Sequence, residues 1–183
     1  MRRILHIAGL CLSFLPAVWG ADLALKFDGV NDFVTFGKAL GLGTTNFTLE
    51  VWFMRTGTGT VASTGTGGLI AIPLVTKGRG EAENSNVDMN YFLGITTNSN
   101  VLCADFEQFG NGTNWPVLGV TTIANDVWYH AAVTYNSTNW ALYLNGSLET
   151  NSPVGVGVLP RYDSIQHAGL GTAMNSTGVT NGT

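Results

Sequence analysis

The amino-acid sequence predicts an all-β protein in which two antiparallel sheets pack as a sandwich. Short segments with alternating apolar and polar residues recur along the chain, separated by turns rich in glycine and asparagine, and this period of two is that of a β-strand. No long segment of the sequence has the 3.6-residue period of an amphipathic helix. Glycine supplies 24 of the 183 residues and charged residues only 11%, which is typical of strands joined by many turns.

The length and net charge of the chain indicate how many domains it forms and which partners it lacks. A chain of 183 residues is long enough for one hydrophobic core and too short for two domains of ordinary size. Its formal charge is −4 at pH 7, and lysine and arginine form no run. We therefore expect no nucleic-acid or anionic-lipid partner, because both require a basic patch.

The beginning of the chain has the pattern of a secretory signal peptide. Arg2 and Arg3 precede an apolar run over residues 4–15, and small residues end the segment before Ala21. This pattern predicts a signal peptide over residues 1–20 and a mature protein that is secreted or held at the cell surface, extracellular or periplasmic. A membrane anchor is the alternative, but the run is shorter than the ~20 residues of a span, so we expect no membrane insertion after cleavage.

The number of cysteines indicates that the fold is stabilised by its hydrophobic core and not by disulfides. Cleavage would remove Cys11 and leave Cys103 as the one remaining cysteine. An exported chain with a single cysteine has no internal disulfide to stabilise it. The apolar neighbours of Cys103 predict a small buried residue in a strand.

The first half of the mature chain predicts strands separated by glycine-rich breaks. Residues 24–36 predict strand, turn and strand, with an acidic break at Asp28-Gly29. Residues 47–55 predict a strong strand with four apolar residues on one face and Thr48, Glu50, Trp52 and Met54 on the other. Residues 57–68 are low in complexity, and we expect a mobile surface loop there.

Further strands follow this loop. Residues 69–76 have strand character, and Pro73 within them indicates an edge strand or a bulge. After a polar loop over residues 77–88, strands 91–96 and 101–106 form a predicted hairpin. The weaker strand candidates are residues 117–123, 153–159 and 165–171.

The strongest local signal is the stretch from Trp128 to Gly146. Residues 127–135 alternate with the period of a strand, a polar turn covers residues 136–139, and a second strand leads to Asn145-Gly146. This dipeptide favours the positive φ angles of a tight two-residue turn, so a third strand is expected from Ser147.

Three stretches together resemble the laminin-G-like family of concanavalin A-like jelly-roll domains. They are Leu25-x-Phe27-Asp28-Gly29, Phe47-Thr-x-Glu-x-Trp52, and Trp128-x-His-x-Ala-x-Thr-Tyr135 followed by a turn and Leu-Tyr-x-Asn-Gly. The resemblance covers about residues 23–172. It implies a two-sheet antiparallel jelly-roll sandwich of the concanavalin A type, in an extracellular protein.

The family pattern ends with a strand that carries an Asp-Glu pair and pairs with the opening strand. Residues 175–183 do not match this pattern. The resemblance therefore implies that the domain over residues 21–183 lacks its last strand and is a truncated part of a longer polypeptide with further domains. Completion by another chain is the alternative, since an unpaired edge is an aggregation hazard.

Enzyme chemistry finds little support in the sequence. Glycosidases on this sandwich use several carboxylates on one strand face, but Glu50 has no such partners, and Asp105 and Glu107 lack a third member. A Gly-x-Ser-x-Gly motif is absent from the sequence. His130, inside a strand, is interpreted as a packed residue. We therefore predict that the protein is not an enzyme.

Two loops carry the candidate site residues. Asp28, Asn31 and Asp32 fall within one turn and offer the oxygen ligands that Ca²⁺ takes, and the resemblance implies such a role; the alternative is that they cap the turn through backbone hydrogen bonds. Trp115 lies in a polar loop, where its indole could stack on a sugar, or fold back as a lid on the core. Tryptophans within strands are interpreted as framework.

The sequence thus predicts a secreted, non-catalytic module that binds a glycan or an extracellular protein, as part of a larger extracellular or cell-surface protein. A structural or adhesive spacer without a small ligand is the alternative, and a relative of glycoside hydrolases comes third. Fold alone does not decide between these functions.

Overall fold

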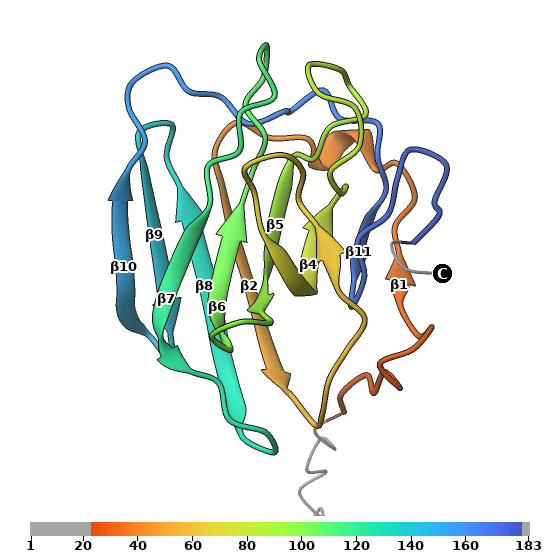
Figure 1. Cartoon of the computed structure of the whole chain (residues 1–183), viewed down its shortest axis with the longest axis vertical. Helices are drawn as coiled ribbons and strands as arrows, with labels where there is room; N and C mark the ends of the chain where they lie inside the picture. The colour runs from red at the N-terminus through yellow and green to blue at the C-terminus, as the bar shows by residue number, and fades with distance from the viewer. Residues whose placement is uncertain (1–22, 181–183) are drawn as a thin grey trace, which may run out of the picture.

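The computed structural model describes residues 23–180, and within them two antiparallel β-sheets pack face to face (Figure 1). The predicted all-β sandwich is confirmed. A single turn of 3₁₀ helix, η1 (Leu40–Leu42), accompanies the described strands. Within residues 23–180 no helix is long and apolar enough to cross a bilayer. The predicted signal peptide, residues 1–20, lies outside the described residues.

The larger sheet has seven strands, and its main path runs β1-β11-β4-β5-β6-β7, with β3 paired to β4. All of its pairings are antiparallel. The strands are β1 (Val34–Thr35), β3 (Ala62–Ser63), β4 (Ile70–Lys77), β5 (Tyr91–Thr96), β6 (Val101–Asp105), β7 (Val117–Thr122) and β11 (Ala168–Leu170).

The smaller sheet has the order β10-β9-β8-β2. Within the described residues β2 pairs only with β8, so it forms an edge of this sheet. The predicted absence of a closing strand stays a prediction. The strands are β2 (Phe47–Met54), β8 (Trp128–Tyr135), β9 (Asn139–Leu144) and β10 (Ser147–Pro153).

The three-strand unit β8-β9-β10 forms as the sequence predicts. In the first turn, the Asn136 side chain accepts hydrogen bonds from the backbone N–H groups of Thr138 and Asn139, at 3.1 and 2.9 Å. In the second turn, Asn145 and Gly146 have φ angles of 50° and 78°. Asparagine and glycine are the residues that tolerate this left-handed conformation, which a two-residue hairpin turn requires.

Aromatic side chains fill the space between the two sheets. The rings of Phe106 and Tyr135 have centroids 4.6 Å apart, and each lies within 5.2 Å of the ring of Trp140. The Tyr135 hydroxyl donates to the Val158 carbonyl at 2.7 Å, so the buried oxygen has a partner. Aromatic pairs of this geometry stabilise the fold by more than the burial of their apolar area alone would.

The glycine-rich segment expected to be a mobile loop is instead ordered. Residues 62–69, here called the glycine flap, include β3 and cover the outer face of the seven-stranded sheet. Thr64 is buried, and its hydroxyl donates to the Asp105 carboxylate at 2.6 Å. Low complexity misled the prediction, because the flap gains its stability from a buried residue 41 positions away.

A second, smaller core lies under this flap. It consists of Ala62, Ala71, Met89, Phe92, Cys103 and Ala173. The prediction that Cys103 is buried in a strand is confirmed, and burial raises the pKa of its thiol. Because this core and the main core lie on opposite faces, β5 and β6 are buried throughout.

Two strand predictions differ from the structure, and the prediction of an edge or a bulge at Pro73 is confirmed by a bulge. Residues 24–28 and 153–159 were each expected to include a strand of their own, but residues 24–28 and 154–159 form none within the described residues, and Pro153 is the last residue of β10. Pro73 lies at a bulge, as predicted, but β4 is not an edge strand. Pro73 is tolerated because β3 pairs with residues 70–71 and β11 with residues 75–77, and it lies between these two partners.

Replacing Phe106 by alanine should remove the centre of the aromatic cluster and leave a cavity. We expect Phe106→Ala to lower the free energy of unfolding by about 4 kcal/mol, measured by urea denaturation. Phe36→Ala is the matched control, because Phe36 is 54% exposed, and its effect should stay below about 0.5 kcal/mol. Equal effects of the two substitutions would contradict this placement of the core.

Candidate functional site

Exposed aromatic residues gather on the outer face of the four-stranded sheet. Trp52 on β2 is 66% exposed and Trp128 on β8 is 49% exposed. In the register of the two strands, Trp52 is opposite His130 and Met54 is opposite Trp128. We call this surface, made by Glu50, Trp52, Met54, Trp128 and His130, the aromatic face.

Polar groups flank the indole of Trp52. The rings of Trp52 and His130 have centroids 5.1 Å apart and are tilted by 45°. His130 Nε2 lies 3.6 Å from Glu50 Oε2, and the Glu50 side chain is 67% exposed. An exposed indole beside an imidazole and a carboxylate offers both a stacking surface and hydrogen-bonding groups.

Of the strand tryptophans interpreted as framework, in the core or on a sheet face, Trp140 lies in the core, and Trp52 and Trp128 lie on a sheet face. Trp140 is buried, and its indole N–H donates to the Trp115 carbonyl at 2.9 Å. Trp52 and Trp128 are exposed because the alternation of their strands directs Phe53 and Tyr129 toward the core side. The signal was present in the sequence, since the other face of residues 47–54, Phe47, Leu49, Val51 and Phe53, is fully apolar.

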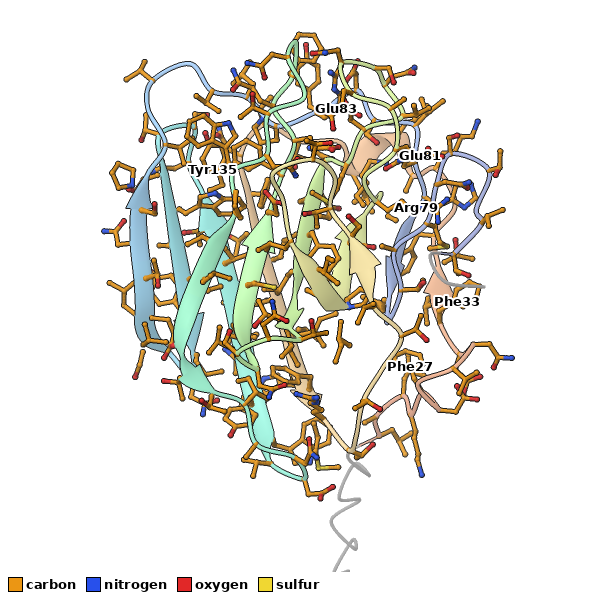
Figure 2. All side chains as sticks on the ribbon, in the orientation of Figure 1. Phe27, Phe33, Arg79, Glu81, Glu83 and Tyr135 are labelled. Carbon is orange, nitrogen blue, oxygen red and sulfur yellow. The ribbon has the colours of Figure 1, made fainter. Side chains whose placement is uncertain are left out.

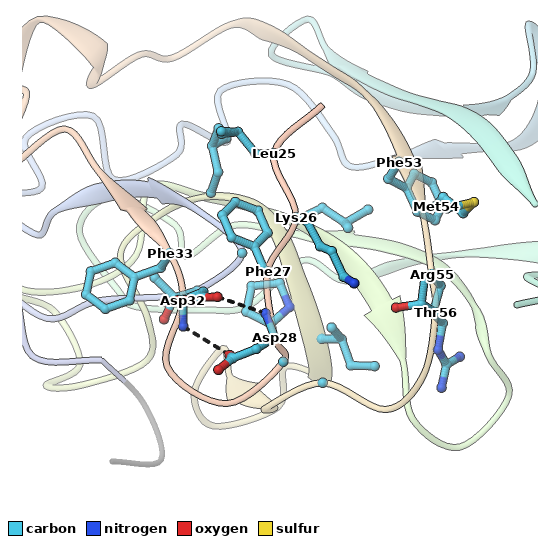
Figure 3. A pocket seen from close by; sticks show the side chains of 18 of the residues that line it. Leu25, Lys26, Phe27, Asp28, Asp32, Phe33, Phe53, Met54, Arg55 and Thr56 are labelled. Atoms are coloured by element: carbon cyan, nitrogen blue, oxygen red, sulfur yellow. Dashed lines mark hydrogen bonds between the residues drawn. The ribbon is translucent and has the colours of Figure 1, made fainter. Parts of the chain in front are cut away.

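A groove follows the free edge of β2, where the two sheets part (Figure 3). Its volume is about 770 Å³, and apolar residues of β2 and β4, such as Val51 and Leu74, are among those that line it. Leu25, Lys26 and Phe27 lie on one side of it in Figure 3, and residues 53–56 lie on the other. Because Trp52 and Trp128 also border this edge groove, it adjoins the aromatic face.

The predicted calcium ligands form a hydrogen-bonded turn. Asp28 Oδ1 accepts from the N–H groups of Val30 and Asn31, at 2.8 and 3.1 Å, and these bonds lower the pKa of Asp28. Asp32 Oδ2 in turn accepts from the Asp28 N–H at 3.1 Å. This is the capping arrangement that was the alternative, and calcium binding by Asp28, Asn31 and Asp32 stays a prediction.

Trp115, the predicted sugar-stacking residue, is half-buried. It packs against the main core, and its Nε1 donates to Gln108 Oε1 at 3.1 Å. The position corresponds to a lid on the core, which was the other interpretation of this residue. A ligand-binding role for Trp115 stays a prediction without support from this geometry.

Asp105 is the last residue of β6, Glu107 follows it in an isolated bridge to Asn114, and both are fully buried. Asp105 accepts hydrogen bonds from Thr64, from the Asn114 side chain at 2.9 Å and from the Trp115 N–H at 2.9 Å. Burial raises the pKa of Asp105 to about 7 and that of Glu107 to about 9. The carboxylates therefore hold the loops in place and lie away from the exposed surface.

The comparisons with known proteins agree with this architecture. The model of the Laminin_G_3 family, described as the concanavalin A-like lectin/glucanases superfamily, matches residues 28–182. The chain belongs to this family, and the jelly-roll sandwich expected from the resemblance is confirmed. No curated protein matches the chain in sequence.

Solved structures similar to this one include the CBM40 carbohydrate-binding module of the Ruminococcus gnavus IT-sialidase. The module bound to α2,3 sialyllactose is 15% identical with a TM-score of 0.51, and the match covers 74% of this chain and 68% of that chain. The structure of the same module without ligand is 16% identical with a TM-score of 0.51, and the match covers 78% of this chain and 70% of that chain. At such low identity the likeness shows a shared fold.

The buried carboxylates predict a pH dependence of stability. Asp105 and Glu107 have folded-state pKa values of about 7 and about 9, above the ordinary values near 4 of the unfolded chain. Their stabilising contribution is therefore complete below pH 4 and is lost as the pH rises through 7 and 9. We expect the melting temperature, measured with EDTA present, to fall between pH 5 and pH 8.

The free energy of unfolding should fall by about 1.4 kcal/mol per pH unit for each carboxyl group that is neutral in the fold and ionised in the unfolded chain. Glu107→Gln provides the control, because glutamine does not ionise, and the decline should be shallower in this variant. A melting temperature that stays constant or rises from pH 5 to pH 8 would argue against neutral buried carboxyl groups.

Proposed function

We propose that the chain is a non-catalytic glycan-binding module of a secreted or cell-surface protein, and that the glycan docks on the aromatic face. One observation carries this proposal: Trp52 is 66% exposed on β2, the edge strand of a regular sheet, beside His130 and Glu50. Further domains of the same polypeptide and an extracellular setting belong to the proposal.

The physical reason for choosing this face is that exposing an apolar indole to water is unfavourable. Tryptophan is highly buried on average, and contiguous apolar surface on a folded protein commonly marks a binding site. The flat indole matches the C–H face of a pyranose ring, while the Glu50 carboxylate and the His130 imidazole can bond to sugar hydroxyl groups. This combination suits a glycan better than a purely apolar ligand.

The likeness to a carbohydrate-binding module supports the proposal and suggests the first ligands to test. The similar structures contain α2,3 and α2,6 sialyllactose, which carry a carboxylate. Lys26 and Arg55 both border the edge groove next to the aromatic face. Sialyllactose and uncharged lactose therefore form an informative pair of probes.

The test is a glycan array probed with the purified protein, followed by titration calorimetry with the glycans that bind. We expect Trp52→Ala to weaken binding about tenfold or more, as for a central aromatic contact in an interface. Its melting temperature should change little, because the side chain is mainly exposed. Phe36→Ala, an exposed aromatic residue beside β1 in the other sheet, should bind as the wild type does.

Two results would count against the proposal. Unchanged affinity in Trp52→Ala would remove the aromatic face as the site, and attention would pass to the edge groove and Trp115. Absence of binding across the array would favour the alternative of a structural or adhesive spacer without a small ligand.

A further inference from the structure

The outward side chains of the four-stranded sheet form rows that run across its strands. In the register of the strand pairs, Glu50 is opposite Ala132, Ala132 is opposite Tyr143, and Tyr143 is opposite Leu148. We call these four residues, one from each strand of the sheet, the cross-strand row. The aromatic face consists of residues on β2 and β8 only, so the cross-strand row continues it onto β9 and β10.

The cross-strand row crosses the middle of the sheet, away from the loops. Figure 2 shows Tyr135, the last residue of β8, near the top of the molecule, where Glu83 also lies. Trp128 begins β8 at its other end, and Ala132 lies between the two ends. The strands on which the row lies are regular and paired, so the spacing of its side chains is fixed before a ligand binds.

The spacing of the strands decides how long a ligand must be to reach two aromatic side chains. Neighbouring strands lie about 4.8 Å apart, and residues two positions apart along a strand are about 7 Å apart. Trp52 on β2 and Tyr143 on β9 are two strands and one outward position apart, so about 12 Å separates their attachment points. One sugar ring is smaller than this separation. A glycan that contacts both side chains therefore contains at least two sugar units.

Ala132 leaves a shallow gap between these aromatic side chains. Its neighbours across the strands are Glu50 and Tyr143, and its own side chain is a single methyl group, so a sugar chain can approach the sheet closely here. The Tyr143 hydroxyl is also available, because within residues 23–180 it has no hydrogen bond to another residue. The hydroxyls of Tyr129 and Tyr135, in contrast, each bond to the backbone.

The charge of this surface favours an uncharged ligand. Among the outward residues of β2, β8, β9 and β10, Glu50 is the one acidic residue, and lysine and arginine are absent. The Glu50 side chain is 67% exposed. An acidic sugar stacked on Trp52 would bring its carboxylate toward that of Glu50, and like charges repel. An uncharged sugar would instead donate hydrogen bonds from its hydroxyl groups to Glu50.

The two basic residues that line the edge groove lie outside the cross-strand row. Arg55 Nε donates to the Gly57 carbonyl at 2.8 Å and its Nη1 donates to Asn100 Oδ1 at 2.7 Å, which holds the guanidinium group at the end of β2. Lys26 lies across the groove from residues 53–56 (Figure 3). Neither cation therefore offsets the charge of Glu50 within the row.

We propose that the ligand of the aromatic face is an uncharged glycan chain of two or more sugar units, which lies across the strands from Trp52 to Tyr143 and passes over Ala132. This inference rests on the proposed glycan-binding function and specifies the class of ligand. Tyr143 is then a second stacking residue, and the small side chain of Ala132 keeps the path between the two aromatic residues open.

The test compares glycan length and charge by titration calorimetry with the purified protein. The probes are neutral gluco-, xylo- and galacto-oligosaccharides from the monosaccharide to the hexasaccharide, any other neutral glycan that binds on the array, lactose, and α2,3 sialyllactose. We expect the affinity to rise about tenfold or more from monosaccharide to trisaccharide, because the second aromatic contact is then made. Lactose should bind more tightly than sialyllactose, and Glu50→Gln should reduce this difference.

Two substitutions test the path across the strands. Tyr143→Ala removes the second stacking residue, and Ala132→Leu fills the gap with a larger side chain. We expect each to weaken the binding of trisaccharides and longer chains about tenfold and to leave the binding of the monosaccharide unchanged. Ala132→Leu removes no part of the sheet, so it tests the path even if Tyr143→Ala folds poorly. The matched control is Tyr162→Ala, because Tyr162 is 40% exposed in a loop outside the sheet, and this variant should bind as the wild type does.

Three results would overturn this inference and leave the proposed function intact, provided that Trp52→Ala still weakens binding. They are equal affinity for the monosaccharide and the longer chains, unchanged affinity in either folded variant of the path, and tighter binding of acidic than of neutral glycans. Absence of binding to every glycan tested is a different result, because it would remove the proposed function and this inference with it.

Discussion

The ring of Phe106, which directly follows β6 of the larger sheet, contacts those of Tyr135 on β8 and Trp140 on β9 of the smaller sheet, and these contacts hold the sandwich together. A sheet that buries one face must present the other, since neighbouring residues of a strand point to opposite sides. Packing of the main core therefore decides which residues every strand exposes. The aromatic face and the buried carboxylates both follow from that constraint.

On the four-stranded sheet, the consequence is a surface of unusual composition. Phe53 faces the core, so Trp52 and Met54 must face outward, and the antiparallel register places them beside His130 and Trp128. A rigid ladder holds these groups at fixed spacing, which lowers the entropy cost of binding a ligand. The fold thus supplies a preorganised surface and leaves its specificity to the side chains on it.

On the seven-stranded sheet, the glycine flap covers the outer face, and carboxyl groups are buried beneath it. The glycine flap buries Asp105 and Glu107 beneath it, and burial disfavours the charged form of a carboxyl group. Thr64, Asn114 and the Trp115 N–H satisfy Asp105, whereas Glu107 keeps one oxygen without a donor. Close backbone approach at Gly65 makes the cover possible, because a side chain there would collide with Glu107.

Alternation and turn chemistry were sufficient to predict the fold class and the hairpins around Asn136 and Asn145-Gly146, because these are local properties of a few residues. The exposure of Trp52 could also have been inferred, from the apolar face opposite to it. Only the tertiary structure could reveal the ordered flap and the unpartnered oxygens of Glu107 and Asn114. Thr64 and Asp105 are 41 residues apart, and such contacts depend on how the sheets and loops meet in space, which no local pattern records.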